Sequence, residues 1–205
     1  MHQYLIDTEF AVKNLLKLAI EEEKILEEQK THLASAEAQF RVHRWDFESS
    51  DLNDDFSDAY VMAAFGRMAK ASQAAERLKQ EIAVLQASVG AHQQATQAIA
   101  GAVLQIAKQG ISLVHGGLKT APEGRKIGSV PIRDIIWQAR NQALHYEEGS
   151  FNSAVTGLFA TLEHEQGTFF SLSLHSSQSR AKQVLSLLGW GDHAAYVQDM
   201  KVLLP

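Results

Sequence analysis

Residues 56–90, FSDAYVMAAFGRMAKASQAAERLKQEIAVLQASVG, decide the fold class of this chain of 205 residues. Apolar side chains recur there mostly at intervals of three and four, the spacing that gathers side chains on one face of an α-helix. Many of them are small, which lets a partner helix approach closely. The stretch therefore predicts a long core helix or one arm of a helical hairpin. The stripe consists of Phe56, Tyr60, Ala64, Met68, Ala71, Ala75, Leu78, Ile82, Leu85 and Val89.

A first long helix is expected before this stretch, with Asp7 as its N-cap. The polar run Ser49–Asp55 ends that helix, and Asp54 or Asp55 is expected to cap the second one. We expect a turn at Val89–Gly90 and a third helix over Ala91–Leu113. The apolar positions of the first helix include Phe10, Leu15, Leu18, Ile25 and Leu33.

Later segments are shorter. Ser129 is expected to cap a helix that has Pro131 in its first turn. Further helices are expected over Asn152–Glu165 and Ser179–Leu188, and Thr168–Leu174 alternates enough for a short extended segment. Asp192 is expected to cap a last short helix.

Composition supports the same class. The chain is 45% hydrophobic and 21% charged, with 13 Gly, 3 Pro and no Cys. These values favour one helical domain over residues 1–205: an all-α up-and-down bundle with a long N-terminal hairpin and third helix (1–110) and a C-terminal region (111–205). No stretch has the length and hydropathy of a membrane span or a signal peptide, so a cytoplasmic location is expected.

Charge and motifs exclude several classes of site. A net charge of −5 argues against broad nonspecific binding of nucleic acid, and the lack of Cys excludes disulfides and Cys-ligated metals. The glutamate run Glu21–Glu28 is interpreted as a solvated helix face. The loop 116–129 fails the phosphate-loop pattern, and no His-Glu-x-x-His is present. We therefore expect no cofactor and no metal.

The chemically suggestive stretch is Arg140-Asn141-x-x-x-His145. Imidazole moves protons near neutral pH, and the guanidinium fork suits phosphate oxygens. An Arg followed by a His four to six residues later is expected by chance roughly once in such a chain. With Asn directly after the Arg, the expectation falls to about 0.01. The tighter pattern therefore marks a candidate site.

This pattern resembles that of the HEPN family (higher eukaryotes and prokaryotes nucleotide-binding), best over residues 98–165. The resemblance implies a HEPN-like helical fold and metal-independent cleavage of RNA by a homodimer. Arg140, His145 and Asn141 would then be the catalytic residues. Some members are toxins or defence proteins, and toxin members can pair with a nucleotidyltransferase antitoxin. In certain toxins a Tyr stands two residues after the His, whereas Glu147 takes that place here.

Helix geometry complicates this site. On a straight helix Asn141 and His145, at i and i+4, share one face and are aligned for a side-chain contact that orients the ring. Arg140 lies roughly 140° around from His145. The long Arg side chain could swing over, the helix could loosen before Gly149, or a dimer could bring two motifs into one groove. Trp137 and Leu144 would supply an apolar rim. Gln138 is expected on the polar face.

Two segments are candidate RNA contacts. Lys119, Arg125 and Lys126 make the loop before the motif basic, which suits a phosphate backbone, although an ordinary solvated loop is an equal alternative. Residues 41–47, RVHRWDF, mix basic and aromatic side chains, as single-strand binders do, but more often such residues form an aromatic plug at a helix end. Alternatives for the whole chain are a noncatalytic HEPN-like module that binds a nucleotide or a partner, and a purely structural hairpin.

Overall fold

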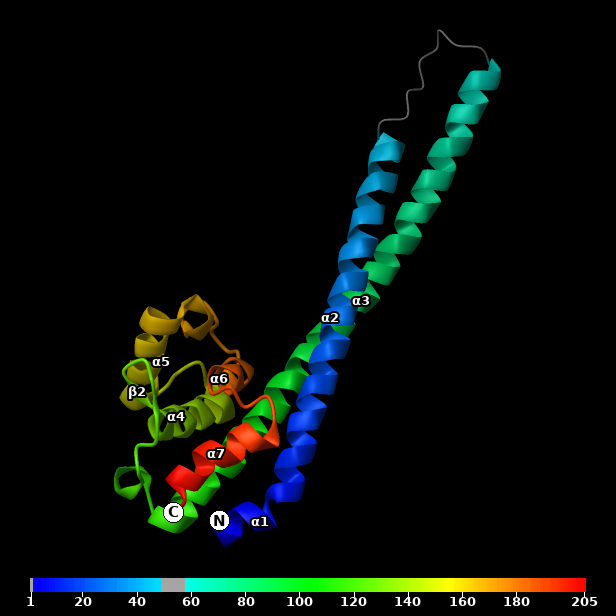
Figure 1. The fold of residues 1–205 in the computed structure, drawn as a ribbon. Coiled ribbons are helices and arrows are strands. Elements are labelled where there is room, and N and C mark those ends of the chain that lie inside the picture. Colours follow the sequence, from blue (N-terminus) through cyan, green and yellow to red (C-terminus); the bar gives the residue numbers. More distant parts are fainter. Residues whose placement is uncertain (1, 49–57) are drawn as a thin grey trace. The chain divides into compact units, whose positions relative to one another are not determined.

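The computed structural model describes residues 2–48 and 58–205, without the side chains of Asp46 and Asp58. The protein is mostly helical (81%), and its long helices α2 (Glu9–Glu48) and α3 (Asp58–His115) form a packed hairpin, as Figure 1 shows. In the described residues the only strands are β1 (Lys126–Ile127) and β2 (Val130–Pro131), which pair in antiparallel fashion. The predicted helical class and N-terminal hairpin are therefore confirmed.

The chain divides into two compact units. One comprises Met1–Glu22 with Gln94–Pro205, and the other comprises Glu23–Gln93. The internal division expected at residues 110/111 differs from this one, because Ala100, Val103 and Leu104 of α3 are buried in the same core as the C-terminal helices. The last turns of α3 thus belong with the site region.

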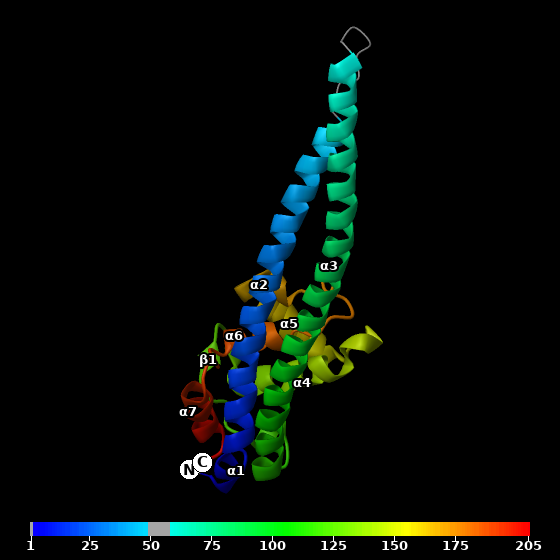
Figure 2. The same cartoon turned by 90° about the vertical axis from the view of Figure 1, so that its right-hand side faces the viewer.

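In the unit Glu23–Gln93, the facing sides of α2 and α3 keep an alternating spacing of three and four residues, as in a two-helix coiled coil. None of the seam residues is exposed, and Leu26, Ala36, Ala64 and Ala71 are buried. Figure 2 shows the two helices side by side. The seam consists of Leu26, Gln29, Leu33, Ala36, Phe40 and His43 on α2, and of Val61, Ala64, Met68, Ala71, Ala75, Leu78, Ile82, Leu85 and Val89 on α3.

The prediction of a turn at Val89–Gly90 is wrong, because α3 is one continuous helix through these residues. The three-and-four spacing continues from Val89 to His92 and Thr96, neither of which is exposed. A helical Gly costs only about 1 kcal/mol relative to Ala, which a continuous packed face can offset. The cap expected at Asp54 or Asp55 lies outside the described residues.

Asp7 is not the N-cap of the first long helix, contrary to the expectation from the sequence. Asp7 ends a short helix, α1 (Gln3–Asp7), and α2 begins two residues later. The N-cap of α1 is His2, whose side chain accepts a hydrogen bond from Tyr4 N–H. Thr8 separates the helices, and its hydroxyl donates to the Tyr4 carbonyl at 2.8 Å. This side-chain bond supplies a local alternative to regular helix hydrogen bonding.

After α3 come the 3₁₀ turn η1 (Leu118–Thr120), the two strands, and helices α4 (Ile132–His145) and α5 (Ser153–Gln166). Two further 3₁₀ turns are η2 (Tyr146–Glu148) and η3 (Thr168–Phe170), and the chain ends with α6 (Ala181–Leu187) and α7 (His193–Leu203). The helices expected over these segments are present. The Asp192 cap is confirmed, since its side chain accepts from Ala195 N–H at 2.8 Å.

Two local expectations in this region are wrong. Pro131, not Ser129, is the N-cap residue of α4, and the Ser129 N–H donates to Glu165 Oε2 at 3.0 Å. The segment Thr168–Leu174 is not extended: it forms η3 and then turns. The Ser171 hydroxyl accepts from Leu174 N–H at 3.4 Å, a serine turn that competes with strand pairing.

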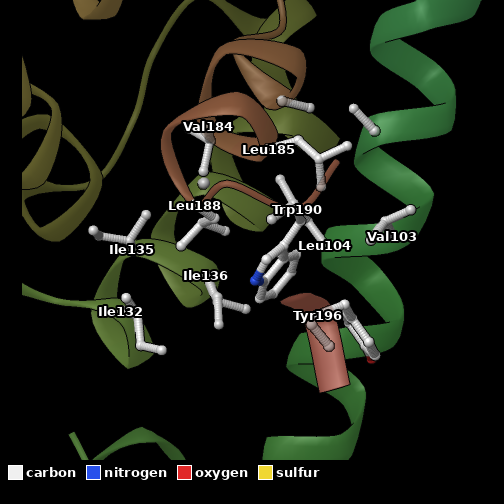
Figure 3. Packing of buried hydrophobic residues seen from close by; sticks show 14 of the residues in the cluster. Val103, Leu104, Ile132, Ile135, Ile136, Val184, Leu185, Leu188, Trp190 and Tyr196 are labelled. Atoms are coloured by element: carbon white, nitrogen blue, oxygen red, sulfur yellow. The ribbon is translucent and has the colours of Figure 1, made fainter. Parts of the chain in front are cut away.

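Trp190 lies at the centre of the core around α4, with Ile136, Leu104 and Leu188 about it (Figure 3). The predicted inner face of α4 is confirmed at Ile132, Ile135, Ile136 and Ala139, all at most 1% exposed. Gln138, expected on the outer face, is buried. None of the helices in residues 2–48 and 58–205 combines the length and apolar composition that crossing a bilayer requires.

Candidate functional site

The motif occupies the last turns of α4, which ends at His145. The 3₁₀ turn η2 follows, and Gly149 closes it with φ +66°, a left-handed conformation that glycine adopts without a steric penalty. Because a 3₁₀ turn aligns side chains three residues apart, η2 places Glu148 next to His145.

His145 is exposed, and its Nδ1 lies 2.6 Å from Oε1 of Glu148. This contact orients the imidazole and leaves Nε2 as the nitrogen that can face a substrate. The expected contact with Asn141 is not formed, because Asn141 Nδ2 donates to Gln138 Oε1 at 3.3 Å instead. Sequence reasoning missed Glu148, although its spacing of three residues from His145 was a readable signal.

Arg140 lies on the flank of α4 that faces α3. Its Nε donates to Gln105 Oε1, and its Nη1 donates to Asn141 Oδ1 at 3.3 Å. Within the described part of the chain its hydrogen-bond acceptors are thus neutral amides, and no carboxylate is paired with it. The guanidinium is held in position while its charge stays available for an anion.

The structure brings Arg140 and Asn141 together but does not join either to His145. Arg140 bonds to Gln105 on α3, and His145 bonds to Glu148 in η2. The offset expected from the helix geometry is therefore present within one copy of the chain. A single copy presents two separate functional groups on one helix.

The three basic loop residues differ in their surroundings. Arg125 donates through Nε and Nη2 to both carboxylate oxygens of Asp199, at 2.7 and 2.8 Å, and this partner raises the pKa of Arg125. Arg125 Nη2 also donates to the Leu188 carbonyl at 2.6 Å. Lys126 lies 3.9 Å from Glu123, and Lys119 is exposed in η1. Through these contacts Arg125 connects its loop to α7 and stabilises the fold.

A further cation near the motif was missed. Lys108 of α3 has its Nζ 4.4 Å from the ring centroid of Trp137, which lies one turn before Arg140 on α4. Burial lowers the pKa of Lys108, and the positive charge of Arg140 lowers it further. The sequence does mark Lys108 as unusual, because it is the only Asp, Glu, Lys or Arg between Glu81 and Lys119.

The buried side of α4 is tied to the segment before α6. Gln142 is 1% exposed, donates to the Gln178 carbonyl at 2.9 Å and accepts from the Arg180 N–H at 2.8 Å. Arg180 is itself buried, and its Nη2 donates to Gln178 Oε1 at 2.9 Å. Burial lowers the pKa of Arg180. These bonds fix the position of the motif helix.

The basic and aromatic segment near the end of α2 is in the other unit. Trp45 is 67% exposed and Phe47 is 40% exposed, so neither forms a buried aromatic plug. Arg44 donates to Glu48 at 2.8 Å, which raises the pKa of Arg44. In the described residues no group of three or more His, Cys, Asp or Glu side chains is placed to hold a metal ion.

Comparison of this chain with models of protein families, with curated proteins and with solved structures found no match.

Proposed function

We propose that this protein is a metal-independent endoribonuclease of the HEPN type that acts as a homodimer. One observation carries the proposal: α4 presents an exposed His145 oriented by Glu148 and, five residues before it, a guanidinium without a carboxylate partner among the described residues. A His with a free ring nitrogen can accept and donate protons. An Arg without a carboxylate partner can stabilise the negative charge on a phosphate group. The proposed location is the cytoplasm.

In the proposed reaction, Nε2 of His145 takes the proton of a ribose 2′-hydroxyl. The 2′-oxygen bonds to the adjacent phosphorus while the P–O5′ bond breaks. The departing 5′-oxygen takes a proton from the second His of the dimer. The products are a 2′,3′-cyclic phosphate, which water can open to a 3′-phosphate, and a 5′-hydroxyl. Arg140 stabilises the charge that builds on the phosphate oxygens, and Asn141 holds its guanidinium.

The offset between Arg140 and His145 supports a dimeric site. Two copies related by a two-fold axis place the His145 of one near the Arg140 of the other, if this side of α4 forms the interface. Leu144, 54% exposed, and the half-buried Trp137 give that side apolar surface. Sedimentation of the purified protein tests this arrangement, since a monomer cannot form a two-motif cleft.

The direct test is cleavage of single-stranded RNA and tRNA in EDTA. We expect the intact protein to cleave and His145→Ala to be inactive. His164→Ala, an exposed His on α5 in the same unit, is the matched control and should stay active. Equal cleavage by His145→Ala and the intact protein would identify a contaminating nuclease and overturn the proposal.

A second candidate is a noncatalytic module that binds a nucleotide or a partner, such as a nucleotidyltransferase antitoxin. The observation in its favour is that Arg140 is engaged with Gln105 and Asn141 and makes no bond to His145. A folded dimer that binds RNA or a nucleotide without cleaving RNA would favour this alternative. Loss of toxicity on coexpression with such an antitoxin would instead favour the nuclease.

A further inference from the structure

Lys108 lies at a defined place beside the motif helix. Its ammonium group packs over the face of Trp137 at 4.4 Å from the ring centroid, and its side chain is half-buried. The electron-rich face of an indole attracts a cation and restricts where it can move. Lys108 is therefore part of the surface formed by α3 and α4 and not a freely moving surface lysine.

The second cation of this surface is Arg140. Its Nε bonds to Gln105, which lies one turn before Lys108 on α3, and its Nη1 bonds to Asn141 on α4. Each of the two helices thus supplies one cation and one amide. Both helix segments belong to the same compact unit.

The two cations repel each other. Burial lowers the pKa of Lys108, and the charge of Arg140 contributes in the same direction. Within the described residues neither cation pairs with a carboxylate, and the acceptors that bond Arg140 are neutral amides. An anion placed between them would relieve this repulsion and gain two charge-assisted contacts.

We propose that Lys108 and Arg140 bind one phosphate group between them, and that this group belongs to the backbone of the RNA substrate. The phosphate chemistry follows from the two cations, whereas RNA as its source rests on the proposed function. Arg140 offers its remaining N–H groups as a planar fork, and Lys108 offers a compact point charge. The amide nitrogen of Gln105 is a neutral donor at the same place.

The same arrangement gives Lys108 a role in positioning the substrate. Arg140 and His145 of one copy are offset around α4, so the proposed dimer pairs the Arg140 of one copy with the His145 of the other. A strand held by a phosphate at Lys108 and Arg140 of one copy would then pass the exposed His145 of the second copy. Lys108 then acts mainly on binding, and its loss should raise KM more than it lowers kcat.

The test measures binding without cleavage. The full chain is titrated with a fluorescent single-stranded RNA carrying 2′-O-methyl groups, which lack the nucleophilic hydroxyl, at several salt concentrations. Lys108→Met keeps the apolar stem and should weaken binding about tenfold. The slope of log affinity against log salt should fall by about 0.7, the value for one phosphate contact on a single strand.

Two variants serve as controls. Lys201→Met removes an exposed lysine of α7 in the same unit and should leave affinity and slope unchanged. Lys108→Arg keeps the charge and should retain most of the binding, which separates loss of charge from loss of fold. Unchanged RNA affinity in Lys108→Met would overturn the proposal.

Inorganic phosphate distinguishes the source of the ligand. Its binding is followed through the Trp137 indole N–H resonance, assigned with Trp137→Phe. If inorganic phosphate perturbs this resonance while RNA affinity is unaffected by Lys108→Met, the site takes free phosphate and the assignment to RNA is overturned. RNA binding that depends on Lys108 in a protein that does not cleave RNA would overturn the nuclease proposal alone.

Discussion

His145 Nδ1 and Glu148 Oε1 lie 2.6 Å apart, joined across the point where α4 passes into the 3₁₀ turn η2. The carboxylate sets which face and which nitrogen of the ring are presented to solvent. Both side chains remain about half exposed, at 48% and 57%. The pair is thus a surface feature with a fixed orientation.

Glu148→Gln should lower the rate of RNA cleavage about tenfold to a hundredfold, because the carboxylate that orients the ring is lost. Single-turnover cleavage measures the effect. Glu147→Gln changes the exposed neighbouring residue and is the matched control. Equal losses in both variants would show that only the local negative charge matters.

Arg140→Lys should impair RNA cleavage even though the positive charge is retained. A lysine cannot donate to Gln105 and Asn141 as a planar fork does, so the group would no longer be held beside the phosphate. Steady-state kinetics of cleavage in EDTA measures the change. Full activity in Arg140→Lys would contradict the argument from fork geometry.

Asp199→Asn should destabilise the fold by about 2–3 kcal/mol, because Asp199 is 7% exposed and accepts from both Arg125 and Trp190. Urea unfolding measures the change. Arg125→Met should also destabilise, whereas Lys126→Met, next to it, should have little effect. If Arg125→Met weakens RNA binding without changing stability, Arg125 contacts the RNA as its loop position predicts.

Gly128→Ala should destabilise the protein by about 1–2 kcal/mol. Gly128 has φ +58°, and an added Cβ would collide with the Glu165 carboxylate that bonds Ser129. Gly157→Ala is the matched control, since its Cβ would meet nothing within 4 Å on helix α5. That variant should be stabilised by about 0.5–1 kcal/mol.

Stability should fall as the pH drops below about 6.5 partly because of His193. Burial, then the charge of Lys13, lowers its pKa from the ordinary value of 6.5. The unfolded chain therefore binds a proton at His193 more readily than the folded chain does. The contribution of His193 to the free energy of unfolding is present above pH 6.5 and is lost as the pH falls through the pKa of His193 in the folded state. His193→Gln should flatten the decline between pH 7 and pH 5. Urea unfolding at several pH values measures it, and an unchanged decline would contradict the assignment.

Much of the fold could be predicted because periodicity is a local property. The spacing of three and four in α2 and α3 marks a packed face wherever it continues, and the same rule identified the core face of α4 at Ile132, Ile135 and Ile136. The turn expected at Gly90 does not form, because continuous packing on either side of this residue offsets its low helix propensity.

For the candidate site, the identities of Arg140, Asn141 and His145 and their offset around α4 follow from the sequence alone. Contacts with distant segments depend on the fold. Arg125 is tied to Asp199 74 residues away, and Lys108 lies over Trp137 because α3 packs beside α4. The contact between His145 and Glu148 spans only three residues and follows from local spacing. Spacing along one helix is set by covalent geometry, whereas contacts between distant segments depend on how the whole core packs.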